Sequence, residues 1–243
     1  MKLTRTALAL TVGALAPALL LATPALAAGS AAAAPAKVAA VTAGESPYDT
    51  MSDHDLRVAV GRILAAKPGK AVIREANKAL DGTIEDVRTF LKTGLAIAQD
   101  EDNRVAIAKI YGDPASGKGV KREAIKAFNG TAADRAAFLK TGLAIAQDED
   151  NRVAIGRIVF ANPATGKAVK REASKAMDGT PADRTAFLKT GLRLAQAEDD
   201  RVAVGVILAR PGISEALYAA AQKVVDGTPE ELRYFITVGQ FQV

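Results

Sequence analysis

From Asp53 onward the sequence repeats itself, and this repetition constrains the possible fold more strongly than any other feature. An Asp/Asn-Gly-Thr motif recurs at spacings of 48, 49 and 48 residues, and each period also contains a phenylalanine and an Arg-Val pair. The motif begins at Asp81, Asn129, Asp178 and Asp226, and the phenylalanines are Phe90, Phe138, Phe187 and Phe235. A period of this length, without strand-like alternation, predicts an array of helical units that bury their apolar faces against one another.

Each unit has the sequence pattern of three helices. The first begins at the Arg-Val pair, and the second, for example Gly119 to Phe128, is amphipathic and ends at an Asn-Gly or Asp-Gly pair. The third begins at a threonine that an acidic residue follows three positions later, which is the pattern of a capping box. We expect this helix to run from Thr83 through Gly94 to about Gln99, with the glycine allowing a neighbouring helix to approach closely.

The predicted fold class is therefore all-α. We expect a right-handed type of α-solenoid, similar to HEAT and armadillo arrays, with four three-helix repeats of about 48 residues. The repeat domain spans residues 53–243, and its units span residues 53–100, 101–148, 149–197 and 198–243.

The repeated block resembles a known family. Thr180 to Gly191 reads T-P-A-D-R-T-A-F-L-K-T-G, and an acidic segment, the residues R-V-A-V from Arg201 to Val204 and an alanine-rich helix ending in D-G-T follow it. This pattern resembles the alanine-leucine-phenylalanine repeats, or ALF repeats, of secreted actinobacterial proteins, over about residues 55–243. The resemblance implies export and repetition, but it implies no activity or mechanism.

The first 27 residues have the pattern of a signal peptide. Basic residues precede an apolar run over residues 7–22, and small residues precede a predicted cleavage after Ala27. An uncleaved membrane anchor is the alternative, but prolines interrupt the run and no basic stop-transfer cluster follows it. We expect a secreted protein, extracellular or loosely associated with the cell wall, with no membrane span after cleavage. Residues 28–52 are rich in alanine and are expected to form a disordered linker.

The composition excludes several kinds of chemical site. The chain has no cysteine and one histidine, so a disulfide, a thiolate metal site, a thiol nucleophile and a histidine cluster are all excluded. His54 could act as a general base, but it lies at the edge of the repeats, where no unit supplies a repeated partner. We therefore predict no enzyme, with no catalytic residue, metal site or cofactor. The alternative, a hydrolase, would need a pocket with converging polar groups.

Acidic residues cluster between the third helix of one unit and the first helix of the next. These clusters could bind calcium or supply paired carboxylates for acid-base chemistry, but they lack the spacing and the glycine of a calcium loop. We expect them instead to form turns that cap the following helix. The clusters are Asp100-Glu101-Asp102-Asn103, Asp148-Glu149-Asp150-Asn151 and Glu198-Asp199-Asp200.

The second helices of the first three units carry a row of basic residues opposite their apolar stripe, which we call the basic ladder. It could bind an extended polyanion, such as a cell-envelope polymer or extracellular nucleic acid, or it could keep the array soluble. The aromatic content of 5% argues against base stacking, so no specific nucleic-acid partner is expected. The candidate ligand-binding residues are Lys70, Arg74, Lys78, Lys118, Lys121, Arg122, Lys126, Lys167, Lys170, Arg171 and Lys175.

The sequence ends within the third helix of the fourth unit. We expect Tyr234, Phe235 and Phe241 to leave an apolar edge there, which self-association or a partner would cover. With these features the sequence predicts a secreted, non-enzymatic binding or scaffolding module. Its expected partner is an extracellular protein or a cell-wall polymer.

Overall fold

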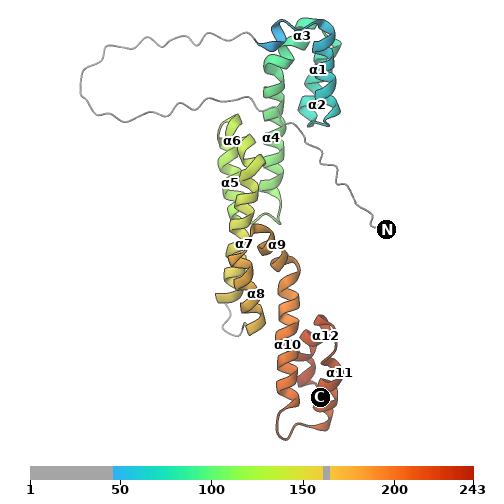
Figure 1. Cartoon of the computed structure of the whole chain (residues 1–243), viewed down its shortest axis with the longest axis vertical. Helices are drawn as coiled ribbons and strands as arrows, with labels where there is room; N and C mark the ends of the chain where they lie inside the picture. Colours follow the sequence, from blue (N-terminus) through green and yellow to red (C-terminus); the bar gives the residue numbers. More distant parts are fainter. Residues whose placement is uncertain (1–45, 161–164) are drawn as a thin grey trace, which may run out of the picture. The chain divides into compact units, whose positions relative to one another are not determined.

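The computed structural model describes residues 46–160 and 165–243, and in these two stretches every regular element is helical (Figure 1). The predicted signal peptide and residues 28–45 of the predicted linker lie outside the described residues. Equivalent helices recur in four units. The fold is an all-α repeat solenoid, as the sequence predicted.

The helices have these bounds. The elements up to the first junction are η1 (Pro47–Asp49), α1 (Asp53–Ala65), α2 (Lys70–Asp81), α3 (Ile84–Thr89) and η2 (Phe90–Gly94). They are followed by α4 (Leu95–Gly112), α5 (Lys118–Asn129), α6 (Ala132–Ala137), η3 (Phe138–Gly142) and α7 (Leu143–Phe160). The remaining elements are α8 (Lys167–Asp178), α9 (Pro181–Ala186), η4 (Phe187–Gly191), α10 (Leu192–Leu208), α11 (Glu215–Val224), α12 (Pro229–Thr237) and η5 (Gly239–Phe241).

The third helix of each of the first three units continues into the first helix of the next unit. Helix α3 passes through η2 into α4, and Gly94, which precedes α4, has helical backbone angles of φ −61° and ψ −38° (Figure 1). No glycine or proline interrupts residues 95–111, and the alanines and leucine there favour a helix. The acidic clusters therefore lie inside helices. The prediction that they form turns capping the following helix is wrong.

A π-helical segment with the sequence Phe-Leu-Lys-Thr-Gly lies at each of these three junctions, as η2, η3 and η4. The phenylalanine ring folds over the glycine that ends the segment, and a Cβ atom added at Gly94 would lie 3.2 Å from Cδ2 of Phe90. The glycine thus makes room for a side chain of its own helix. It does not serve the approach of a neighbouring helix, contrary to the expectation from sequence.

The apolar core is divided among the units. Each of the four clusters of buried apolar residues takes its members from one unit or its boundary, and each contains one of the repeated phenylalanines. These side chains are only 4% to 6% exposed. They are Phe90, Phe138, Phe187 and Phe235. The main apolar clusters lie within units, whereas the sequence had suggested burial between neighbouring units.

Polar side chains connect one unit to the next. Arg135 of α6 is 3% exposed, and it donates to both carboxylate oxygens of Asp100 in α4, at 2.6 and 2.8 Å. Arg184 of α9 is 1% exposed and binds Asp148 of α7 in the same way, at 2.5 and 2.8 Å. These guanidinium groups hold the pKa values of both carboxyl groups below their usual range. The shared helix and this ion pair therefore link adjacent units.

The beginning of the described chain is ordered. Ser46 caps the short helix η1, and Tyr48 and Met51 pack against the core of the first unit. The backbone carbonyl of Tyr48 accepts a hydrogen bond from Arg88, and Lys92 pairs with Asp49 at 2.7 Å. Residues 46–52 therefore belong to the first unit, which corrects the assignment of the whole stretch 28–52 to a disordered linker.

The C-terminal unit buries one of the three aromatic residues that the sequence placed at an open edge. Phe235 is 6% exposed and lies in the core of that unit, while Tyr234 and Phe241 are 57% and 76% exposed. The edge proposed from sequence thus consists of Tyr234 and Phe241 alone. None of the helices in the described residues is both long and apolar enough to cross a bilayer.

Candidate binding groove

The acidic clusters bind the start of a different helix from the one that the sequence suggested. Asp102 in α4 accepts hydrogen bonds from the backbone amides of Ala71 and Val72, at 2.9 and 3.1 Å, and so caps α2. A Cβ atom added at Gly69, which precedes α2, would lie 2.2 Å from Cγ of Asp102. Because only glycine leaves room for the incoming carboxylate, the motif depends on both residues. Asp150 and Asp199 cap α5 and α8 in the same way.

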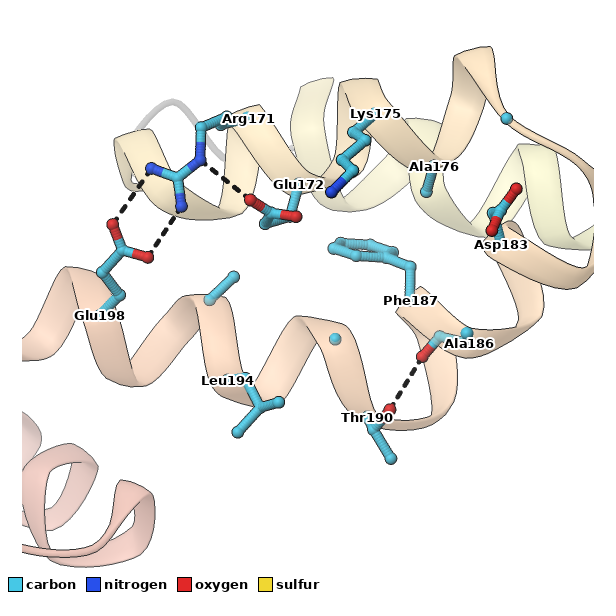
Figure 2. Close-up of a pocket in the computed structure, with 13 residues that line it drawn as sticks. Arg171, Glu172, Lys175, Ala176, Asp183, Ala186, Phe187, Thr190, Leu194 and Glu198 are labelled. Carbon is cyan, nitrogen blue, oxygen red and sulfur yellow. Dashed lines mark hydrogen bonds and ion pairs between the residues drawn. The ribbon is translucent and has the colours of Figure 1, made fainter. Parts of the chain in front are cut away.

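The glutamates of the acidic clusters bind the arginines of the basic ladder. Glu198 of α10 accepts two hydrogen bonds from Arg171 of α8, at 3.1 and 2.8 Å, and Arg171 also binds Glu172 at 2.9 Å (Figure 2). This contact lowers the pKa of Glu198. Arg74 and Arg122 form the equivalent ion pairs. Each arginine of the ladder is thus neutralised within the protein.

The lysines of the basic ladder remain at the surface. Six of the eight are exposed and make no salt bridge with the described residues: Lys70, Lys78, Lys118, Lys167, Lys170 and Lys175. Lys121 is half-buried, and Lys126 lies 3.8 Å from Glu123 with 81% of its side chain exposed. Within each of the three units the ladder therefore consists mainly of exposed lysines and one arginine that already has partners.

A groove lies between the second helix of the third unit and the start of the long helix α10 (Figure 2). Ala176, Phe187 and Gly191 line it, and its volume is about 560 Å³. The Arg171–Glu198 ion pair lies at one end and Asp183 at the other (Figure 2). Such a volume and a largely apolar lining are typical of ligand sites.

The same groove recurs in the second unit with a volume of about 630 Å³. Its lining includes the equivalent residues Ala127, Phe138 and Gly142. One large aliphatic side chain at the groove is exposed in each of these units, Ile145 at 69% and Leu194 at 56%, and the equivalent Ile97 of the first unit is 71% exposed. Ile97, Ile145 and Leu194, with the pockets described beside the last two, are called the repeat groove below.

Comparison with protein families identifies four matches of one repeat, described as short repeats of unknown function and named ALF. The matches cover residues 57–98, 104–146, 152–195 and 201–242. The chain belongs to the ALF repeat family. No curated protein matched the chain in a further search.

Each matched ALF repeat begins at an Arg-Val pair and ends three or four residues after the recurring glycine, so it contains its own phenylalanine and the position equivalent to Ile97. The fourth ALF repeat departs from the others at that position. Gln242 stands where the other units have an aliphatic side chain, and Ala219 stands where they have the ladder arginine. The aliphatic position of the repeat groove is thus shared by the first three ALF repeats only, among the four that match.

Hydrogen bonds keep the aspartates of the groove ionised. Hydrogen bonds from Thr180 hold the pKa of Asp183 below its usual range, and Thr131 does the same for Asp134. Such carboxylates stay ionised near neutral pH, where a general acid would need a raised pKa. Among the described residues no group of three or more histidine, aspartate or glutamate side chains could hold a metal ion. His54 is exposed in α1 and lines neither of the two pockets.

Sequence reasoning missed the repeat groove, although a signal was present. The apolar stripe of the third helix contains Phe90, Leu91, Leu95 and Ala98, and Ile97, seven positions after Phe90, lies at its edge. A large aliphatic residue recurs at this edge, three positions after the glycine, in each of the first three units. That pattern could have pointed to a surface used for binding.

Proposed function

We propose that the chain is an exported, non-enzymatic repeat module that binds a protein partner through the repeat groove. The observation that carries this proposal is the exposure of Ile97, Ile145 and Leu194, at 71%, 69% and 56%. A single exposed aliphatic residue needs no explanation, but here an exposed aliphatic residue recurs at the same position in three units, and in two of them it lies beside the same pocket. A protein partner supplies the apolar side chains that such a surface would bury.

The basic ladder supports a polyanion as the main ligand less well. Each of its arginines is bound by two glutamates, so a phosphate or sulfate group would have to displace an existing ion pair. A polyanion also gains nothing from the aliphatic residues of the groove. Export rests on the signal-peptide pattern of residues 1–27, and amino-terminal sequencing of the protein from culture medium should find Ala28 first.

A pair of matched double variants tests binding through the groove. Ile97→Ser/Ile145→Ser removes two groove residues, whereas Val105→Ser/Val153→Ser removes two exposed aliphatic residues from the same helices α4 and α7. Partners cross-linked from the culture of the producing organism should be lost with the first variant and retained with the second. Equal recovery with both variants would show that the groove does not bind the partner.

A further inference from the structure

Asn129 differs from the other asparagines of the chain in the residue that follows it. Asn129 precedes a glycine, whereas the others precede lysine, arginine or proline. Those others are Asn77, Asn103, Asn151 and Asn162. Because glycine has no side chain, its backbone nitrogen can approach the side-chain carbonyl carbon of the preceding residue without hindrance. Asn129 is also exposed, at the last position of helix α5. It therefore has the setting for an intramolecular reaction that releases its side-chain nitrogen.

The other three units already contain the aspartate that such a reaction would form. An aspartate occupies the position of Asn129 in each of them and also precedes a glycine. These residues are Asp81, Asp178 and Asp226. The backbone is nearly the same with either residue, since φ and ψ are −82° and −160° at Gly130 and −85° and −160° at Gly179. An aspartate at position 129 is therefore compatible with this helix end.

The buried Arg135 holds the backbone on both sides of Asn129. Its Nη1 atom donates to the carbonyl oxygens of Phe128 and Gly130, at 3.0 and 2.6 Å. The amide of Gly130 donates to the carbonyl oxygen of Ala127 at 3.1 Å. A ring closed between Asn129 and Gly130 would hold Cβ of the first and the nitrogen of the second nearly eclipsed, and a helical residue keeps these atoms apart. The helix end must therefore open before the ring can close.

We propose that Asn129 is a site of slow deamidation and that the contacts of Arg135 set its rate. The nitrogen of Gly130 loses its proton and bonds to Cγ of Asn129, and the side-chain nitrogen leaves as ammonia. One water molecule then opens the cyclic imide. Breaking the bond from the nitrogen to Cγ gives aspartate, and breaking the bond from the nitrogen to the backbone carbonyl carbon gives isoaspartate. Isoaspartate adds Cβ to the main chain, so Arg135 no longer reaches both carbonyl oxygens.

The test follows the mass of the peptide that contains Asn129 while the purified protein is kept in mildly alkaline buffer, either folded or in urea. One variant, Asp100→Ala/Arg104→Ala/Arg135→Leu, removes the contacts and puts in place of the ion pair the apolar residues that the fourth unit has there. Arg104 is included because the equivalent Arg201 donates to the helix-end carbonyl of the fourth unit. Circular dichroism checks that the variant keeps its helices.

The third unit supplies a matched control. Asp148→Ala/Arg152→Ala/Arg184→Leu makes the same change one unit later and leaves the hydrogen bonds around Asn129 in place. This control separates a local effect on Asn129 from a general loss of stability. A further variant, Asn129→Asp, represents the product and should unfold at the same urea concentration as the wild type. A marked loss of stability in this variant would overturn the claim that the aspartate fits.

We expect the product to form at Asn129 before any other asparagine reacts, and to form faster in urea than in the folded protein. The first triple variant should accelerate the reaction in the folded protein about tenfold, because the lost hydrogen bonds no longer oppose opening, and the control should leave the rate unchanged. Reaction in urea that is no faster at Asn129 than at Asn103 or Asn151 would overturn the site. Equal rates with and without urea, or equal acceleration by both triple variants, would overturn the role of Arg135.

Discussion

In the second and third units, the two middle units, a buried arginine of the third helix donates to carbonyl groups at the end of the second helix. In the first and fourth units, the two end units, the exposed arginine of the Arg-Val pair donates there instead. Arg135 donates to the carbonyl oxygens of Phe128 and Gly130, at 3.0 and 2.6 Å. In the fourth unit Leu232 occupies that position, and Arg201 of the Arg-Val pair donates to the carbonyl oxygen of Gly227 at 3.2 Å. The carbonyl groups at a helix end need a donor, and two different residues meet the same need.

The first and third units show the same exchange. Val87 takes the buried position in the first unit, and Arg57 donates to the carbonyl oxygen of Leu80 at 3.0 Å. Arg184 fills the position in the third unit and donates to the carbonyl oxygen of Gly179 at 2.8 Å. Whether this position holds an arginine or an apolar residue depends on the preceding long helix, because a buried arginine requires an aspartate from that helix as its partner.

The partner position changes together with the arginine. Asp100 and Asp148 face the buried arginines, and Ala197 stands at the equivalent place before Leu232. Ala197 and Leu232 are 2% and 0% exposed and belong to one apolar cluster. The same junction between units is therefore built once from an apolar pair and twice from an ion pair.

In the fourth unit, different residues stand at the positions that contact an acidic cluster of the following helix in the other units. Ser214 caps α11 with its own side chain, which accepts from the amide of Leu217 at 3.2 Å, where the other units have a glycine and an aspartate from the next long helix. Glu215 stands at the first helical position in place of lysine, and Ala219 replaces the arginine that binds a later glutamate. The fourth unit thus caps its second helix locally, where the other units use the long helix that follows.

Truncation of the core phenylalanines should have the largest effect and tests whether each core belongs to its own unit. Phe138 and Phe235 are 5% and 6% exposed, so alanine at either position should cost about 3 to 5 kcal/mol of unfolding free energy. Similar losses in a middle and an end unit, measured by urea unfolding of single variants, would follow from cores confined to units. A much smaller loss for Phe235→Ala would show that neighbouring units contribute to the middle cores.

Breaking the buried ion pair of the third unit should have the next largest effect. Arg184→Ala leaves Asp148 with only the exposed Arg152 as partner and leaves the carbonyl oxygen of Gly179 without its donor. Removing one member of a buried pair costs more than replacing both members by apolar residues. We expect a loss second only to that of the phenylalanine variants, again in urea unfolding.

The apolar junction of the fourth unit supplies the matched control. Asp148→Ala/Arg184→Leu copies the pair formed by Ala197 and Leu232 into the third unit. The double variant should recover more than half of the stability that Arg184→Ala loses, because no buried charge remains unpaired. A double variant as unstable as the single one would mean that the arginine is needed mainly for the helix-end carbonyls.

The exposed arginine of the end units should have a smaller effect that depends on position. Arg201→Ala removes the donor to the carbonyl oxygen of Gly227 and should cost about 0.5 to 1 kcal/mol. The equivalent Arg152 of the third unit instead pairs with Asp148 within its own helix, at 3.1 Å, so Arg152→Ala should cost less. Equal costs in thermal unfolding would contradict the exchange of roles between middle and end units.

These comparisons show what the sequence could and could not predict. The capping boxes at Thr83, Thr131, Thr180 and Thr228 are local patterns, and all four are present. The phenylalanine positions and the all-α repeat fold follow from the repetition every 48 or 49 residues, which can be read directly from the sequence. The contact between Asp102 and the start of α2 spans about thirty residues, so no local pattern reveals it, and the cluster was assigned to the nearest helix. Predicting the groove would have required the same knowledge of contacts between residues distant in the sequence.

The smallest expected effect concerns two interface carboxyl groups whose pKa values shift in opposite directions. Arg184 lowers the pKa of Asp148, so the stability from that contact is complete above the unfolded pKa of about 3.8 and is lost as pH falls through the folded value. Burial raises the pKa of Asp200, so ionisation of this group costs stability, and that cost appears as pH rises through its folded pKa. Lowering the pH should therefore reduce the free energy of unfolding through Asp148 and increase it through Asp200.

Asp200→Asn isolates the contribution of the end unit. Asn103 and Asn151 occupy the equivalent positions in the second and third units, so the amide fits this place in the helix. One oxygen of Asp200 is buried without a hydrogen bond, although Arg233 lies 3.1 Å from it. The variant should be more stable than the wild type by up to about 1 kcal/mol at neutral pH, and the difference should vanish below the unfolded pKa of about 3.8 in unfolding curves across a pH series. A variant that is less stable at neutral pH would mean that attraction to Arg233 outweighs the burial of the charge, and the end unit would then rely on an ion pair as the middle units do.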